Sequence, residues 1–270
     1  MSHYLTDLAD VLRAAGLVVS EERGLSKVSG SMIDWPIFGR SSNSQYVTGR
    51  PTAVMNHHTV SKTAPANDVN YCNVVSDIRP LTNLIIVRDG TVHVCAGGPT
   101  NTNGSGKDTW GGGVPENDMN RYAIGIEITN LGNGRDPYPE AQQNAVMDTN
   151  VALCQAYNIS PNSCRAHFEW APGRKIDPKG PSRWAPGGGL WDMDAFRAEV
   201  ESELEGEEDD MKTQYVWRHK TIAGAFWVCD GSVVHLDGDM LDDLRGKGVR
   251  EIVSDNNDVA DSYKRVARGL

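Results

Sequence analysis

The sequence predicts an α/β domain, with a central mixed β-sheet flanked by helices, followed by a small C-terminal α+β module. Three observations lead to this prediction. Short apolar runs that suit buried strands alternate with longer segments of helical periodicity over residues 5–204. A block of mostly acidic residues, EGEEDDMK, interrupts this pattern at 205–212. The residues after the block read again as short strands, which indicates a second, smaller unit.

The composition is that of an ordinary globular protein, with 39% hydrophobic and 23% charged residues among 270. The formal net charge of −10 disfavours nonspecific binding to nucleic acid, so we expect no nucleic-acid partner. No apolar run approaches the roughly 18 residues of a membrane span, and the N-terminus lacks the basic segment of a signal peptide. We therefore expect neither membrane insertion nor a signal peptide. The five cysteines form no CxxC pair, which favours reduced thiols over a disulfide framework or a cysteine zinc site.

The first elements follow from periodicity and stop signals. An amphipathic helix is expected near residues 5–15, where leucines recur at helical spacing before a glycine. Residues 21–48 are rich in serine and glycine and show no period, which predicts a long surface connection. The first buried strand should cover residues 52–56 and end at His57.

The middle of the chain predicts a hairpin, a long loop and a second buried strand. Runs at 84–87 and 91–95 flank an Asp-Gly turn, which is a strong hairpin signal. The segment 97–120 is far too long and too rich in glycine and asparagine for a routine connection, and such loops are usually functional or mobile. We expect it to wall a substrate groove. The run AIGIEI at 123–128 then reads as a buried strand.

Two helices and an acidic block complete the plan. A helix is expected from Pro139 to Tyr157, and another begins at a capping aspartate near 192 and runs to 204. We assign residues 1–204 to one domain with its core at about 52–196, residues 205–212 to an acidic linker, and residues 213–270 to the small module. Its expected elements are strands at 214–218, 221–229, 232–236 and 251–254, with a short helix near 240–245.

Two segments carry residues suited to metal-assisted hydrolysis. The run NHHT closes the first strand, so the imidazole of His57 can project from the strand end into a cleft. The run AHFEWAPGRKIDP places His167, Lys175 and Asp177 around a Pro-Gly turn, where the chain can double back and bring His167 and Asp177 to one metal. A hydrolytic zinc site needs three protein ligands and an open fourth position for water. Each motif alone is usually incidental, and only their combination predicts a zinc site.

Glu127 interrupts the apolar run AIGIEI. Burying an unpaired carboxylate costs several kcal/mol, which favours a functional placement over a charge at a strand edge. Lys175 and Asp177 are two residues apart, so in extended structure their side chains point to the same face.

Together these pieces resemble the type 2 N-acetylmuramoyl-L-alanine amidases, whose fold is shared with peptidoglycan-recognition proteins. The resemblance covers roughly residues 52–196, and APGRKIDP is its most specific motif. It implies one zinc ion per chain held by His57, His167 and Asp177. It also implies that Glu127 acts as general base and then acid, and that Lys175 donates to the oxyanion. With aspartate as the last ligand, the site is similar to those of muropeptide-recycling amidases and many actinobacterial phage lysins.

One departure from the family is informative. Some members carry a catalytic tyrosine at the position of Thr82, so that role is absent in this chain. The recycling branch uses instead a glutamate in its IGIE strand, and Glu127 stands there.

Substrate contacts are harder to predict from the sequence. Adjacent strand residues point to opposite faces, so we expect His58 to support a ligand or line the groove. Asn83 and the loop 97–120 are candidates for contacts with sugar or peptide. Trp170 and Trp184 could stack on glycan, although buried packing suits either equally well.

The sequence thus predicts an amidase that cuts bacterial peptidoglycan between the lactyl group of muramic acid and L-alanine. The layout of catalytic domain, linker and small module favours a phage endolysin that stays in the host cytoplasm until the membrane is permeabilised. The small module is then a candidate for binding the cell wall. The alternatives are a bacterial autolysin, a muropeptide-recycling amidase, or a non-catalytic peptidoglycan-binding protein. The host, the ligand of the small module, the oligomeric state and the preference for polymer or soluble muropeptide stay open.

Overall fold

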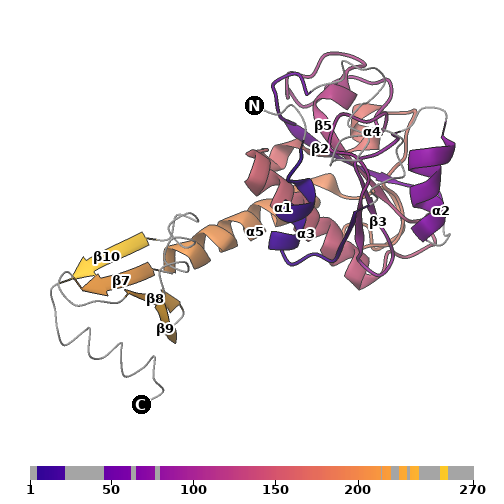
Figure 1. Ribbon diagram of the computed structural model, residues 1–270. Coiled ribbons are helices and arrows are strands. Elements are labelled where there is room, and N and C mark those ends of the chain that lie inside the picture. Colours follow the sequence, from indigo (N-terminus) through magenta and orange to yellow (C-terminus); the bar gives the residue numbers. More distant parts are fainter. Residues whose placement is uncertain are drawn as a thin grey trace. The chain divides into compact units, whose positions relative to one another are not determined.

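The computed structural model describes residues 5–21, 46–61, 65–76, 80–213, 215–219, 225–229, 232–236 and 250–254. The chain divides into two compact units, Met1–Glu201 and Ser202–Leu270, which are described separately below (Figure 1). Among the described residues, no helix combines the length and the apolar character needed to span a membrane.

The first unit is built on a six-stranded mixed sheet with the order β1-β4-β3-β5-β2-β6. All neighbouring strands run parallel except β3 and β4, which form the antiparallel hairpin. The adjacent parallel strands β2 and β5 are buried almost throughout, as expected for parallel strands covered on both faces. The strand bounds are Val19–Glu21 for β1, Ala53–His58 for β2, Leu84–Ile86 for β3, Val92–Val94 for β4, Ala123–Ile128 for β5 and Cys164–Ala166 for β6.

Helices flank this sheet. In Figure 1, α2 lies on one side of the strands and α1 and α3 lie on the other. The predicted mixed sheet flanked by helices is therefore confirmed. The helix bounds are Leu8–Ala14 for α1, Pro65–Asn70 for α2, Tyr71–Val75 for the π-helical turn η1, Met119–Arg121 for η2, Glu140–Tyr157 for α3, Pro161–Ser163 for η3, His167–Trp170 for α4 and Met193–Thr213 for α5.

Two features of this unit differ from the sequence prediction. The three-residue edge strand β1 was not predicted, because so short a strand leaves no periodicity to read. Within the predicted surface connection 21–48, Tyr46 is buried at 1% exposure, and its hydroxyl accepts a hydrogen bond from the Asn83 side chain. Residues 22–45 of that connection lie outside the described residues.

The acidic block 205–212 also differs from its prediction, since α5 continues through it to Thr213. Glutamate, lysine and methionine are good helix formers, and extending an existing helix avoids the cost of a new nucleus. Like-charge repulsion therefore does not interrupt the helix here. That this block links two domains stays a prediction.

The second unit contains a four-stranded sheet with the order β10-β7-β8-β9. Strand β8 pairs antiparallel with β7 and β9, whereas β10 joins β7 in parallel. The predicted short strands are thus present, and the helix predicted near 240–245 lies outside the described residues. The bounds are Tyr215–His219 for β7, Ala225–Cys229 for β8, Ser232–Leu236 for β9 and Arg250–Ser254 for β10.

Two close contacts hold the strands that carry the site. The side chains of Asn56 on β2 and Asn150 on α3 are fully buried and exchange two hydrogen bonds of 3.2 and 3.1 Å. They tie the helix to the strand one residue before His57. On β5, a Cβ at Gly125 would lie 2.2 Å from the Thr102 hydroxyl, so only glycine lets the loop 97–120 pack directly on the strand.

Candidate metal centre and active site

The site forms where three parallel strands end. Strands β5, β2 and β6 are neighbours and run in the same direction, so their carboxyl ends meet at one edge of the sheet. His57 lies directly opposite Glu127 in the β2–β5 register, and His167 is the first residue after β6. Polar side chains at the carboxyl ends of parallel strands are a common origin of binding sites in α/β proteins. The fold therefore assembles residues that lie up to 110 positions apart in the chain.

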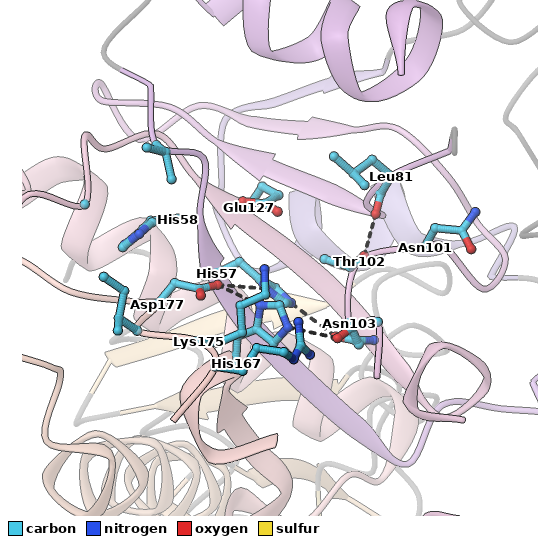
Figure 2. Close-up of a pocket in the computed structure, with 15 residues that line it drawn as sticks. His57, His58, Leu81, Asn101, Thr102, Asn103, Glu127, His167, Lys175 and Asp177 are labelled. Carbon is cyan, nitrogen blue, oxygen red and sulfur yellow. Dashed lines mark hydrogen bonds and ion pairs between the residues drawn. The ribbon is translucent and has the colours of Figure 1, made fainter. Parts of the chain in front are cut away.

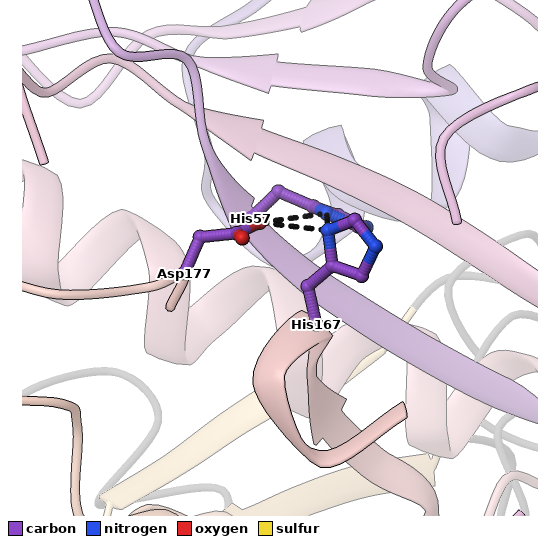
Figure 3. Close-up of side chains that lie close together, drawn as sticks. All are labelled: His57, His167 and Asp177. Atoms are coloured by element: carbon purple, nitrogen blue, oxygen red, sulfur yellow. Dashed lines mark hydrogen bonds and ion pairs between the residues drawn. The ribbon is translucent and has the colours of Figure 1, made fainter. Parts of the chain in front are cut away.

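Three potential ligand atoms converge at this edge (Figure 3). His57 Nδ1 lies 2.8 Å from His167 Nδ1 and 3.1 Å from Asp177 Oδ2. His167 Nδ1 lies 2.9 Å from the same carboxylate oxygen. All three residues are buried and form a cluster that could hold a metal ion. Zinc bonds of about 2.0–2.2 Å in tetrahedral geometry place ligand atoms roughly 3.3 Å apart, so this triangle needs only slight expansion to accept the ion.

The outer nitrogens of both rings point to Asn103. His57 Nε2 lies 3.1 Å from Asn103 Oδ1, and His167 Nε2 lies 2.8 Å from the Asn103 backbone oxygen. When each Nε2 donates to an Asn103 oxygen, which only accepts hydrogen bonds, each Nδ1 is left with a lone pair that faces the cluster. Two nitrogen lone pairs and a carboxylate oxygen repel one another at these distances. A cation bound between them makes the same arrangement favourable. The donor set and its protonation state therefore fit a divalent metal, and two imidazoles with one carboxylate suit zinc.

The electrostatics also favour metal binding at neutral pH. Burial lowers the pKa of His167 to about 4, and the adjacent His57 adds to this effect. Burial alone would raise the pKa of Asp177, but its interactions with His167 and His57 outweigh burial and hold that pKa well below its usual range. His167 is thus neutral and Asp177 ionised at neutral pH. These are the forms that bind a metal without first losing a proton.

Glu127 stands beside the three ligands, on β5. Its side chain is partly buried, and its Oε2 is sealed from solvent with no hydrogen-bond partner among the described residues. Burial raises the pKa of Glu127 to about 7, although the neighbouring His57 and Lys175 act to lower it. A carboxyl group that titrates near neutral pH is well matched to both accepting and delivering a proton.

The ligands and Glu127 line one cavity of about 480 Å³ (Figure 2). Lys175 also lines this cavity, and Figure 2 shows it beside His57 and His167. Residues 101–104 of the long loop 97–120 line the cavity. The sequence predicts this loop as the wall of a substrate groove. The exposed apolar side chains of Val60 and Ile176 also line the cavity.

The structure separates the predicted substrate contacts into two groups. His58 lines the cavity, where its Nδ1 accepts a hydrogen bond of 3.1 Å from the Lys179 backbone. Asn83 is instead fully buried, and its amide bonds to the backbone of the surrounding loops. Trp170 is also fully buried, with its Nε1 donating to the Gly104 oxygen. As placed, neither Asn83 nor Trp170 presents its side chain to a ligand in this cavity. Their polar groups already bond within the protein, so a substrate contact by either residue stays a prediction.

The structure also places three further residues, Thr82, Trp184 and Asn103. Thr82 is fully buried and donates its hydroxyl proton to the Gly125 oxygen, so it cannot replace the tyrosine found in some relatives. Trp184 is 4% exposed, and its Nε1 donates to Glu199, which assigns it to packing. Asn103 was not predicted, because nothing in the sequence distinguishes it from the other asparagines of the long loop.

A buried pair of histidines with an aspartate, next to a carboxylate and an ammonium in one cavity, defines a candidate metal-dependent hydrolase. Residues 47–180 match the model of the N-acetylmuramoyl-L-alanine amidase family, and the domain that contains them belongs to this family. The match supports N-acetylmuramoyl-L-alanine amidase activity for this domain. None of the curated proteins compared with the chain matches it.

Several solved structures show a distant likeness to the chain. A selenomethionine derivative of AmpD has a TM-score of 0.45 and 21% identity, covering 62% of this chain and 91% of its own. The catalytic domain of XlyA has a TM-score of 0.45 and 15% identity, covering 68% and 99%. The amidase LysC from Clostridium intestinale has a TM-score of 0.38 and 16% identity, covering 56% and 86%. These likenesses are too distant to transfer residue roles.

Proposed function

We propose that the chain is a zinc-dependent amidase that cleaves the bond between the lactyl group of muramic acid and the L-alanine of the stem peptide. The observation that carries this proposal is the convergence of three potential ligand atoms from His57, His167 and Asp177 in the cavity that also holds Glu127. The family assignment supplies the substrate class.

Each polar residue of the cavity then has a distinct task. A zinc ion held by the three ligands supplies a Lewis acid and makes water acidic near neutral pH. Glu127 accepts the proton of the attacking water and later delivers it to the leaving amine of L-alanine, so the proton count balances. Lys175 donates to the negative charge that develops on the scissile carbonyl oxygen, where an ammonium is worth most in the transition state.

The completeness of the site argues against a non-catalytic peptidoglycan-binding protein. In such a protein at least one metal ligand or proton-transfer group could be lost without penalty. Here all three ligand positions, Glu127 and Lys175 are present and share one cavity. Glu127 in particular keeps a buried and unpartnered oxygen, which is a cost that packing alone would not maintain.

We further propose that the enzyme serves as a phage endolysin. The second unit, Ser202–Leu270, supports this proposal because a small added module suits a lysin better than an enzyme that recycles soluble muropeptides. In this role the protein would collect in the host cytoplasm and reach the wall after the membrane is permeabilised. A bacterial autolysin is the alternative.

The activity can be tested on purified peptidoglycan. Digestion with the full chain should produce free L-alanine amino termini and leave the glycan strands intact, as measured by mass spectrometry. His57→Ala is the control that should give no product. New reducing sugar ends would contradict the amidase and indicate a glycosidase. Faster turnover of crosslinked sacculi than of soluble muropeptides is expected for a lysin, and the reverse preference would contradict that role.

A further inference from the structure

Besides the candidate ligand Asp177, Asn103 is the one described residue that hydrogen-bonds both ligating histidines, and it does so at their outer nitrogens. Its side-chain Oδ1 accepts from His57 Nε2 at 3.1 Å, and its backbone oxygen accepts from His167 Nε2 at 2.8 Å. The residue is 1% exposed, so water does not compete for these bonds. One residue of the loop 97–120 therefore contacts Nε2 of both rings, which leaves Nδ1 of each ring on the side of the candidate metal site.

Only the oxygen of the Asn103 side-chain amide makes a hydrogen bond among the described residues. Its Nδ2 is buried and has no hydrogen-bond partner among the described residues. Leaving a buried donor unpaired costs about 1–3 kcal/mol, so the donor end does not explain an asparagine at this position. The acceptor end does, because only an oxygen can hold the proton of His57 Nε2 and leave Nδ1 free for the metal.

The loop that carries Asn103 is fixed to the helix that carries His167. The Asn103 backbone N–H donates to Asn120 Oδ1 at 2.9 Å, and the next residue, Gly104, accepts from Trp170 Nε1 on α4 at 3.1 Å. A Cβ at Gly106 would lie 2.4 Å from the Trp170 backbone oxygen, so the loop packs on α4 without a spacer. The acceptor oxygens thus hold a defined position relative to His167, as required of a group that orients a ligand.

We propose that Asn103 is a positioning residue for the metal centre, which fixes the tautomer and ring orientation of His57 through its side chain and those of His167 through its backbone. The inference rests on the proposed zinc site and deepens it. Replacing a partner of this kind typically lowers metal affinity by about 10- to 100-fold.

Two substitutions separate the acceptor from the volume of the side chain. Asn103→Leu keeps the approximate size and removes the acceptor, so the zinc dissociation constant should rise by about 10- to 100-fold. Asn103→Asp keeps an oxygen at the same place and should retain native affinity. Thr102→Val is the matched control in the same wall, because it removes a buried hydroxyl bonded to the Leu81 oxygen without altering a contact to either histidine. Affinities are measured on the full chain by competition with a chromophoric chelator.

Nitrogen NMR of the metal-free chain gives a second readout that a general loss of packing would not produce. In Asn103→Leu the His57 ring should lose its single tautomer, whereas His167 should keep Nε2–H because its acceptor is backbone. Native-like zinc affinity in Asn103→Leu, or equal losses in the Leu and Asp variants, would overturn the proposal. His57→Ala tests the zinc site separately: if it loses zinc and Asn103→Leu does not, only the role of Asn103 fails.

Discussion

Replacing Glu127 with glutamine should make the metal-free protein more stable at alkaline pH while it removes catalysis. Glutamine keeps the shape of the side chain and carries no charge, so it relieves the burial of a carboxylate. It also cannot accept the proton of the attacking water, so kcat should fall by about 10²- to 10⁴-fold. A catalytic group that strains its own fold is a recognised form of the trade-off between stability and activity.

The size of the effect follows from the pKa. Burial raises the pKa of Glu127 from 4.5 to about 7, which corresponds to at most about 3 kcal/mol, since the side chain is only partly buried. The folded state holds this proton more tightly than the unfolded state. The penalty is therefore absent below about pH 4.5, grows as the pH rises to about 7, and is constant above. Between pH 5.5 and pH 8, the stability advantage of Glu127→Gln should grow by about 2 kcal/mol.

Urea unfolding of the chelator-treated chain at these two pH values measures this difference. Glu116→Gln is the matched control, because it removes the same charge from an exposed position of the loop 97–120. A stability advantage of Glu127→Gln that is equal at both pH values, or that shrinks as the pH rises, would refute the reasoning from burial.

Three further outcomes are expected. Lys175→Ala should keep zinc and the fold, while kcat falls by about 10²- to 10³-fold with little change in KM. The reason is that the ammonium acts on charge present only in the transition state. Steady-state kinetics and metal analysis check this. The acid limb of the kcat/KM profile should lie at or below pH 7, since Glu127 must be ionised and a bound cation lowers its pKa further; Glu127→Gln should abolish that limb. Asn150→Leu should lower the free energy of unfolding by about 1–3 kcal/mol, because it leaves the buried Asn56 Oδ1 without the donor that Asn150 supplies; an unchanged urea midpoint would contradict this.

Much of the site could be predicted because its residues lie at strand ends. The strand that ends in His57 and the run AIGIEI are short apolar segments with clear limits, and parallel pairing then brings His57 and Glu127 into register. His167 and Asp177 sit on either side of a Pro-Gly turn, so their approach is also a local property of the sequence.

The remaining features depend on contacts that no local pattern records. Asn83 and Asn103 are both asparagines near glycine-rich loops, yet one satisfies backbone groups in the interior and the other orients two imidazoles. Trp170 directly precedes the motif APGRKIDP, and it is buried where the long loop packs on it. The length of α5 depends on helix propagation, which a count of acidic charges does not reveal.

The central claim is that His57, His167 and Asp177 together hold a catalytic zinc ion. Metal analysis of the purified full chain tests it most directly. The account predicts one zinc per native chain, loss of most of it in His57→Ala, His167→Ala and Asp177→Ala, and full retention in Lys175→Ala. Full zinc occupancy in all three ligand variants would contradict the site.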